Sequence, residues 1–450
     1  MGIKRYELNH VLSVYAILIP VLFFALNYCI FSIEFNIIEF LMVIIITVNT
    51  LFFYGSDHDY LDPIVYFPIL YFALYWIGDF DFGFYPEVPQ KMWNLYLLGL
   101  IGFYLGAYFW KIGKIHFKKK KLVELLNADS RKILVAIYLI CMISKMIMFA
   151  KNGIPLFASN IDASRQNSAE SFGILKVISS AYTVIAVFIW YDMLLRVKNR
   201  QEVPIINYLI LLSSFIVAIC DVSRLLIIQM IIPMILIYII KIKKIKLTKI
   251  LSLVFLILIF IGGNKLVRNI LDNPEYYRYI TDDRGTNLFE NIMLSCFTSF
   301  RVGIDDLRQL VDVVPSVHSY THFQMFLNSI LTVLPGKQVV IGYYVAELLG
   351  MKFDGIGAAT TILGMFYLDG GPGLILLGMA FLGLFIEYFY TRYVREGQID
   401  ITNILAVYVL YYSINCLRTN VMPTIEPLLF IAYYFGFGIL IRSTYGKEMK

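Results

Sequence analysis

Three arginines of this chain stand where membrane-embedded helices are expected to end, and guanidinium groups at such places could bind phosphate. Arg224 opens an apolar run in "CDVSRLL", Arg268 follows another in "NKLVRN", and Arg418 ends a third in "NCLRTN". A guanidinium stays charged when partly desolvated and can bind two phosphate oxygens at once. The alternative is that each side chain merely reaches the lipid headgroups. Three such groups at one membrane depth favour a ligand that carries a diphosphate.

Two further arginines are expected on the same side of the membrane. Arg165 lies in the polar stretch "KNGIPLFASNIDASRQNSAES", and Arg301 lies in "SFRVGIDD". Arg301 could add to a diphosphate site. It could instead form an ion pair with Asp305, four residues further along a helix, which would leave it no role in binding.

Candidate acids and bases also fall on this side. His318 and His322 are spaced to share one helix face, and Glu426 is flanked by prolines in "MPTIEP". The histidine pair could ligate a metal or could simply form a polar helix face, and no HExxH pattern accompanies it. A carboxylate near the headgroups is costly unless it is paired or used, which makes Glu426 a catalytic candidate. Other carboxylates expected nearby are Asp305, Asp354 and Asp369.

Metal and cofactor sites are not expected from the sequence. The triplets Asp57-His58-Asp59 and Asp79-Phe80-Asp81 offer two carboxylates each, and an oxygen-ligand metal site needs more than two. A divalent ion at the outer triplet, Asp79-Phe80-Asp81, stays open as the alternative. P-loop, Rossmann glycine and nucleophile-elbow patterns are missing from the sequence. The prediction is therefore a chemistry without metal or cofactor, in which the substrate supplies the energy.

Composition identifies the solvent that must surround these residues. Hydrophobic residues make up 59% of the 450-residue chain and charged residues 16%, more apolar surface than a soluble globule can cover. Helices satisfy their own backbone hydrogen bonds in lipid, and strand alternation is absent, so an all-α polytopic membrane protein is expected. About twelve apolar runs are long enough to cross a bilayer. They cover 10–31, 35–54, 61–78, 92–110, 132–150, 172–195, 204–220, 223–240, 248–265, 372–391, 401–418 and 424–441.

Charge predicts the orientation of these spans. With both termini in the cytoplasm, the alternate loops that hold the lysine run 118–121 and most other lysines and arginines also fall inside, as the positive-inside rule requires. The lysine run is then a topology signal rather than a nucleic-acid patch. The first apolar run is too long for a signal-peptide core and is expected to stay as an anchor.

The spans divide the chain into three parts: helices 1–9 in 1–265, a long outer region in 266–356, and helices 10–12 in 357–450. Two stretches of the outer region, "NLFENIMLSCFTSFRVGIDDLRQL" and "THFQMFLNSILTVL", have helix-period apolar faces. Such a region is expected to form a lid or platform on the membrane. The stretch "GIGAATTILGMFYLDGGPG" that follows could be a closely packed helix or a re-entrant half-helix, and the sequence leaves both open.

Four of these segments together resemble the Wzy-type oligosaccharide repeat-unit polymerases, also called O-antigen polymerases. They are "DVSRLLIIQMIIPMIL", "LPG" at 334–336, "GIGAATTILGMFYLDGGPG" and "LRTN". The resemblance extends over most of the chain in the order of its parts, although each motif is short. Members of the family often carry a glutamate after the glycine that corresponds to Gly364, where this chain has Met365.

The resemblance implies a C-type membrane glycosyltransferase in a bacterial cytoplasmic membrane, with its active site facing outward. It would transfer a growing glycan from undecaprenyl diphosphate onto a newly delivered lipid-linked repeat unit of O-antigen, capsule or a related polysaccharide. Expected partners are these lipid-linked oligosaccharides, membrane lipids, a chain-length regulator and a flippase. Arg224 and Arg418, with Arg268, Arg301 or Arg165, would hold the diphosphate. Glu426, His318 or His322 would guide the attacking hydroxyl.

Two other functions remain open. A glycan ligase would share the outward arginines and the long outer region, and would differ in its acceptor. A transporter or flippase would need internal pseudo-symmetry and charges lining the membrane midplane. Midplane charges are few in this chain, Lys145 being the clearest, so the transporter ranks below the two transferases.

Overall fold

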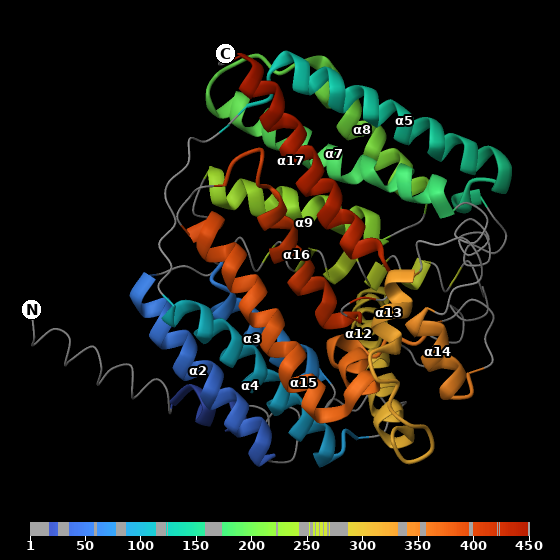
Figure 1. Ribbon diagram of the computed structural model, residues 1–450. Helices are drawn as coiled ribbons and strands as arrows, with labels where there is room; N and C mark the ends of the chain where they lie inside the picture. Colours follow the sequence, from blue (N-terminus) through green and yellow to red (C-terminus); the bar gives the residue numbers. More distant parts are fainter. Residues whose placement is uncertain are drawn as a thin grey trace, which may run out of the picture.

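The structure is a computed structural model, and it describes most but not all of the chain. The described residues are 18–25, 36–57, 61–77, 87–113, 123, 125–157, 173–221, 224–242, parts of 252–270, 287–331, 340–351, 357–395, 399–420, 422 and 424–448. Every regular element in these residues is a helix (Figure 1). The expected all-helical class is therefore confirmed for this part of the chain.

The helices follow the apolar runs closely. They are α2 Ile37–Asp57, α3 Pro63–Trp76, α4 Gln90–Ile112, α5 Ala128–Asn152, α7 Gly173–Lys198, α8 Ile205–Cys220, α9 Arg224–Lys241, α12 Leu288–Val313, α13 Gln324–Leu331, α14 Ile341–Leu348, α15 Thr361–Phe389, α16 Leu405–Arg418 and α17 Glu426–Glu448. A 3-10 turn, Pro155–Phe157, follows α5, and a π-helical turn, Tyr390–Arg395, extends α15.

Five of the helical segments in the described residues are long and apolar enough to cross a bilayer, which makes the protein a helical membrane protein. These segments are Gln90–Ile112, Ala128–Phe157, Leu175–Lys198, Thr361–Arg395 and Glu426–Tyr445. Shorter apolar helices correspond to α2, α3, α8 and α9. The number of about twelve spans stays a prediction, as does the division of the chain at 266 and 356.

Local sequence explains where several helices begin. Asp62 caps α3 by accepting a hydrogen bond from Ile64 N, and Pro63 occupies the first helical position, where its missing N–H is harmless. Asn127 caps α5 through Ser130 N. At α12, Asn287 and Glu290 form a capping box in which each side chain accepts from the other's backbone N–H.

Helices α4 and α15 pack with their backbones in close contact, and glycines make this possible. A Cβ on Gly102 would lie 2.5 Å from the Leu376 carbonyl oxygen, and one on Gly106 would lie 1.7 Å from that of Ala380. A Cβ on Gly383 would meet the Phe103 oxygen at 2.2 Å. The residue of α15 that each glycine meets lies further along the chain as the glycine does, from Gly102 with Leu376 to Gly106 with Ala380, so α4 and α15 run parallel. Small residues are the usual means of such close packing between membrane helices.

The helix ends gather at two ends of the bundle (Figure 1). At the first, which we call the Lys111 end, Lys111 lies 2.6 Å from Asp62 and 3.7 Å from Glu387, which joins the start of α3 to the ends of α4 and α15. Contacts at the same end join α7 to α9, through Lys198 Nζ and the Lys241 carbonyl, and the start of α16 to the end of α17.

The second end, which we call the Arg418 end, holds the opposite termini of the same helices. Lys145 on α5 forms an ion pair with Asp221 after α8, at 2.6 Å, and Lys176 on α7 pairs with Glu426 on α17, at 3.3 Å. The predicted alternation of spans places certain helix ends on the same side of the membrane, and those ends contact one another in the structure. Which end faces the cytoplasm stays a prediction.

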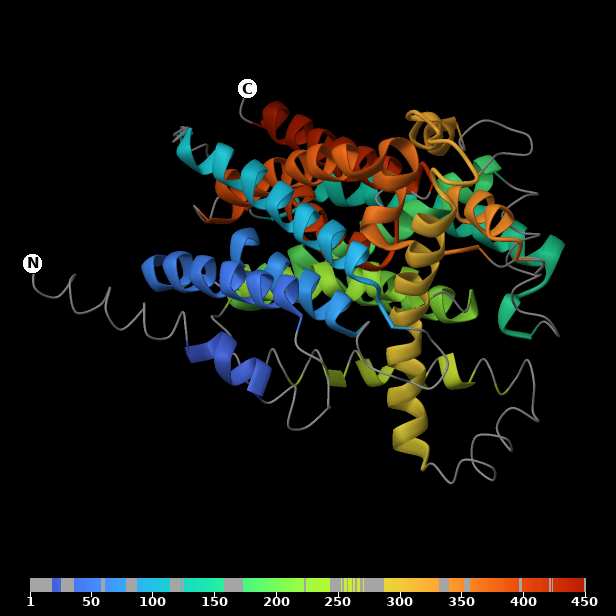
Figure 2. The same cartoon turned by 90° about the horizontal axis from the view of Figure 1, so that it is seen from below.

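Helix α12 and the break in α15 set the Arg418 end apart from a simple bundle. Figure 2 shows α12 crossing the direction of the other helices. Helix α15 breaks at Gly370 (φ −169°, ψ 21°) and Gly371 (φ 66°, ψ −156°), so a short helix, 361–369, turns sharply into the long one. At Gly371 a Cβ would lie 2.7 Å from the Tyr320 hydroxyl oxygen, and the positive φ also favours glycine. Of the stretch expected to be either packed or re-entrant, residues 357–360 are non-helical, and the described residues that follow form a helix broken before Pro372.

Candidate functional site

Arg418 is the last residue of α16 and lies against α12. Its guanidinium carbon is 5.7 Å from the centroid of the Phe300 ring, a cation–π distance. The chain leaves the helix at Thr419, where the backbone is extended (φ −108°, ψ 171°). Among the described residues, no side chain accepts a hydrogen bond from the Arg418 guanidinium. It is therefore able to donate hydrogen bonds to a ligand.

Arg301 follows Phe300 on α12 and is only 1% exposed. The alternative partner, Asp305, accepts hydrogen bonds instead from Arg308 Nε at 3.0 Å and from Gln309 Nε2 at 2.7 Å. The ion pair between Arg301 and Asp305, offered as the alternative to a binding role, is therefore not formed. A buried guanidinium on the helix that contacts Arg418 keeps Arg301 among the candidates for an anion site.

A non-helical segment, 357–360, leads into the short helix of α15 and packs against α12. Asp306 accepts a hydrogen bond from Ala359 N at 2.9 Å, and a Cβ on Gly303 would lie 2.6 Å from the Ala359 oxygen. Gly303 also lies close to the backbone of Arg418, since its Cβ would be 3.7 Å from the Arg418 oxygen. Glycine at this position allows α12, the segment and the end of α16 to meet.

Polar side chains from the start of α15, from the residues after α16 and from α3 hold this junction together. Thr360 and Asn420 contact each other at 2.7 Å through their side-chain oxygens, and Tyr75 lies 3.0 Å from the Thr361 hydroxyl. Thr361 has a positive φ of 59°, which is rare for a β-branched residue and marks a backbone conformation imposed by its surroundings. Burial raises the pKa of Asp306 to about 6, with Asp305 adding to the effect and the Ala359 N–H opposing it.

The proposed acids and bases lie in different surroundings from those expected. His318 and His322 are exposed in the turn between α12 and α13, and His322 has a positive φ of 49°, so the shared helix face is wrong. Helix α12 ends at Val313 because Pro315 follows, and proline cannot donate the next helical hydrogen bond. Glu426 begins α17 and is half-buried in its ion pair with Lys176.

Asp369 has a structural task at the break in α15. It is 2% exposed and accepts hydrogen bonds from Thr321 Oγ1 at 2.5 Å, Met325 N at 3.1 Å and Phe326 N at 3.2 Å. Two of these donors are the free N–H groups of the first turn of α13. A carboxylate used in this way caps a helix, which argues against its role as an acid or base.

Several predicted residues fall outside the described part of the chain. Arg224 is the first residue of α9, and only its backbone is described. Outside the description entirely are Arg165, Arg268, Asp354, Asp59, Asp79, Asp81 and the "LPG" at 334–336; for Asp57 only the backbone is described.

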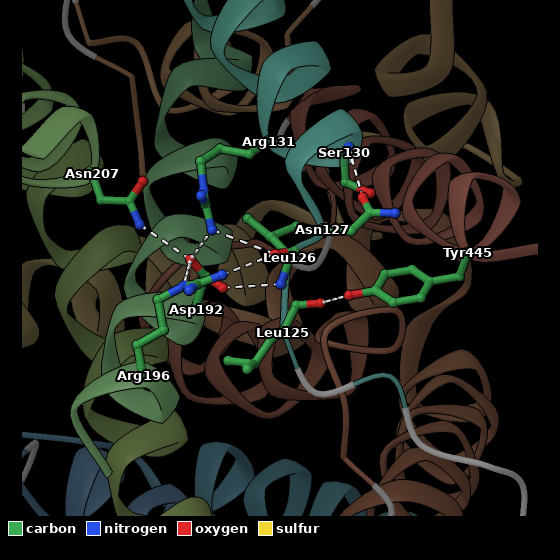
Figure 3. Close-up of polar contacts among 9 residues, drawn as sticks. All are labelled: Leu125, Leu126, Asn127, Ser130, Arg131, Asp192, Arg196, Asn207 and Tyr445. Atoms are coloured by element: carbon green, nitrogen blue, oxygen red, sulfur yellow. Dashed lines mark hydrogen bonds and ion pairs between the residues drawn. The ribbon is translucent and has the colours of Figure 1, made fainter. Parts of the chain in front are cut away.

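Two arginines at the Lys111 end, Arg131 and Arg196, are engaged in a buried network and differ in this from Arg418 (Figure 3). Asp192 on α7 accepts hydrogen bonds from Arg196 Nε at 2.9 Å, Arg131 Nη2 at 3.2 Å and Asn207 Nδ2 at 3.2 Å. The same carboxylate accepts from Leu126 N at 2.9 Å, so it fixes the segment before α5 against three helices. These two arginines stabilise the fold.

Sequence reasoning missed Asp306, Thr360 and Asn420. All three lie inside stretches that the sequence analysis singled out, "SFRVGIDD", "GIGAATT" and "LRTN", but nothing in one sequence indicates that those stretches touch. Lys145, expected at the membrane midplane, lies instead at the Arg418 end and pairs with Asp221 at 2.6 Å. Asp221 precedes Arg224 by three residues.

The described geometry defines a helical membrane protein with a polar junction at one end of the bundle, built from α12, the start of α15 and the end of α16. No family model matches the chain, and neither curated proteins nor solved structures yielded a match.

Proposed function

We propose that the protein is an oligosaccharide repeat-unit polymerase of the Wzy type, a membrane glycosyltransferase that works on undecaprenyl-diphosphate-linked glycans at the outer face of a bacterial cytoplasmic membrane. The observation that carries the proposal is Arg418, whose guanidinium is free of acceptors within the described residues and rests on the Phe300 ring of α12. Arg301, buried one residue further along α12, supports it.

The reaction follows from what such groups can do to a diphosphate. An acceptor sugar hydroxyl attacks the anomeric carbon of the donor glycan, and the bond from that carbon to the diphosphate oxygen breaks. Negative charge grows on the departing undecaprenyl diphosphate, and the Arg418 guanidinium, with Arg301 and Arg224, stabilises that charge. The proton of the hydroxyl passes to a base, for which Glu426, His318 and His322 are the candidates.

Among the candidate bases, Glu426 is favoured by its ion pair with Lys176. Its carboxylate lies 3.3 Å from Lys176 Nζ, and both side chains are partly exposed, so the pair can open to a sugar hydroxyl without uncovering a buried charge. The two histidines are exposed in a turn, so either could accept the proton only if the acceptor sugar extended from the arginines to that turn.

A ligase is the second candidate, because it breaks the same bond and needs the same arginines. It differs in passing the glycan to an acceptor that is not a lipid-linked repeat unit. A transporter is less favoured, because Lys145, expected at the membrane midplane, pairs with Asp221 at the Arg418 end.

The test is a reaction of the purified protein with lipid-linked repeat units alone, followed by separation of the glycans by length. The polymerase gives products of increasing length, a ligase gives none, and a transporter moves unaltered units across a vesicle membrane. Arg418→Ala and Arg301→Ala should each lower polymer formation by ~10²-fold, as loss of a charge-stabilising donor does in other enzymes. Arg442→Ala is the matched control, since Arg442 is exposed at the Lys111 end and donates to Thr402. Full polymerisation by Arg418→Ala, with normal protein level, would refute the site.

A further inference from the structure

Helix α13 is buried on one face and apolar but uncovered on the other. Met325 and Ser329 face inward and are buried. On the outward side Phe323, just before the helix, is 54% exposed and Leu327 is 56% exposed, and Phe326 and Leu331 are also exposed. The helix sequence, "QMFLNSIL", contains no charged residue. An apolar face of this kind rarely stays in contact with water.

The position of α13 indicates what covers this face. Asp369 caps α13 at the point where α15 breaks, and Figure 2 shows α13 at the edge of the bundle near that break. Beyond the break, the long part of α15 exposes Leu377 (66%) and Phe381 (69%). This part belongs to one of the long apolar helices, so its exposed stripe faces lipid. Asp369, which caps α13, precedes the exposed Leu377 by eight residues on α15.

We propose that α13 lies in the membrane interface at the Arg418 end, with Phe323, Phe326 and Leu327 in contact with lipid acyl chains. A helix with one apolar face and no charge fits the boundary between headgroups and chains, where its apolar side chains enter the hydrocarbon. A charged protein partner would find no complementary charge on α13, whereas acyl chains need none. The lipid surface is therefore the occupant that the composition and position of the helix favour.

Lipid contact would also fix the height of the polar junction in the bilayer. Asp369 joins α13 to the short helix 361–369, which begins at the junction with α12 and α16. A helix held at the interface by its apolar side chains would keep Arg418 and Arg301 near the headgroup level. This inference does not depend on the proposed transferase activity.

The test uses the whole protein in phosphatidylcholine vesicles, made with or without bromine on the acyl chains. Leu327→Trp adds a fluorophore to α13, and its emission is obtained by subtracting that of the unchanged protein with its four tryptophans. Brominated chains should quench most of the added emission, and aqueous iodide should quench little of it. Ser316→Trp, in the exposed turn after α12, is the control and should show the reverse.

Either other pattern overturns the proposal. If iodide quenches Leu327→Trp as it quenches Ser316→Trp, the face of α13 is in water. If neither quencher acts on Leu327→Trp, another protein surface or another part of the chain covers the helix. Phe323→Trp replaces one exposed aromatic residue by another and gives a second reading of the same face, in case Leu327→Trp lowers the amount of folded protein.

Discussion

Arg418 rests on Phe300, with the guanidinium carbon 5.7 Å from the ring centroid, and this contact joins the end of α16 to α12. The aromatic face attracts the cation but offers no acceptor oxygen, so the N–H groups can still donate hydrogen bonds to a phosphate. An arginine so supported is held in place before its ligand arrives.

Replacing the ring tests this support. Phe300→Leu should lower the rate of glycan polymerisation, because a cation–π contact is worth roughly 0.5 to 2 kcal/mol, or about 2-fold to ~30-fold in rate. Phe300→Tyr should restore most of it. Phe289→Leu, on the exposed side of the same helix, is the control and should leave the rate unchanged. Equal rates for Phe300→Leu and the unchanged protein would show that the ring does not position Arg418.

Asp306 predicts a pH dependence of stability. Its pKa in the folded protein is about 6, above the ordinary value of 3.8, so the folded state holds the proton more tightly. Stability from this group is present below pH ~4 and is lost as the pH rises through ~6, by roughly 3 kcal/mol for a difference of about two pKa units. Asp306→Asn keeps an acceptor for Ala359 N and removes the charge. It should therefore unfold at a higher temperature than the unchanged protein at pH 7, with the difference shrinking towards pH 4.

The control for Asp306 is Asp312→Asn. Asp312 lies on the same helix but is half-exposed, in contact with Lys91 and Arg308, and its replacement should not remove the pH dependence. Thermal unfolding in detergent across pH 4 to 8 compares the three proteins. Parallel curves for Asp306→Asn and the unchanged protein would contradict the burial effect.

The close contact between α4 and α15 predicts that adding one methyl group at Gly106 lowers the stability of the protein strongly. Gly106→Ala would place its Cβ 1.7 Å from the Ala380 oxygen, so the helices must separate, at a cost of about 1 to 3 kcal/mol or more. Gly436→Ala on α17 meets no atom within 4 Å and should be neutral or slightly stabilising. The unfolding midpoint in detergent decides between these outcomes, and similar midpoints for both variants would mean that α4 and α15 are not packed this closely.

The Asp192 network predicts a large loss of stability when its acceptor is removed. Asp192→Ala leaves Arg131 and Arg196 without the carboxylate between them, and breaking a buried ion pair typically costs about 3 to 5 kcal/mol. Asp129→Ala removes an exposed carboxylate beside Lys132 and should cost less than ~1 kcal/mol. The amount of folded protein in the membrane measures both, and normal levels of Asp192→Ala would contradict the structural role.

Sequence reasoning succeeded where one helix determines the answer. The runs 92–110, 132–150 and 172–195 correspond to α4, α5 and α7 within a few residues, because apolar length and local caps define a membrane helix. It failed for the histidines because the i, i+4 spacing received more weight than Pro315, which ends the preceding helix.

The polar junction could be predicted only in part. Arg418 was found because a cation at a helix end is unusual in itself. Asp306, Thr360 and Asn420 acquire meaning only through contacts between residues that lie 53 and 60 positions apart in the chain. One sequence does not indicate which distant residues lie close in space, so the residues that build the junction could be found only from the structure.

The parallel packing of α4 against α15 has a consequence for how the chain reaches its final form. The glycine-lined face of α4 enters the membrane early in synthesis, and its partner emerges only after more than half of the chain has followed. During that interval the glycine-lined face of α4 contacts lipid or other membrane proteins, because contacts between residues so distant in sequence form late. Chains interrupted before α15 should therefore present this face to the cell's membrane proteases and insertion factors, which makes the assembly of the bundle dependent on its last third.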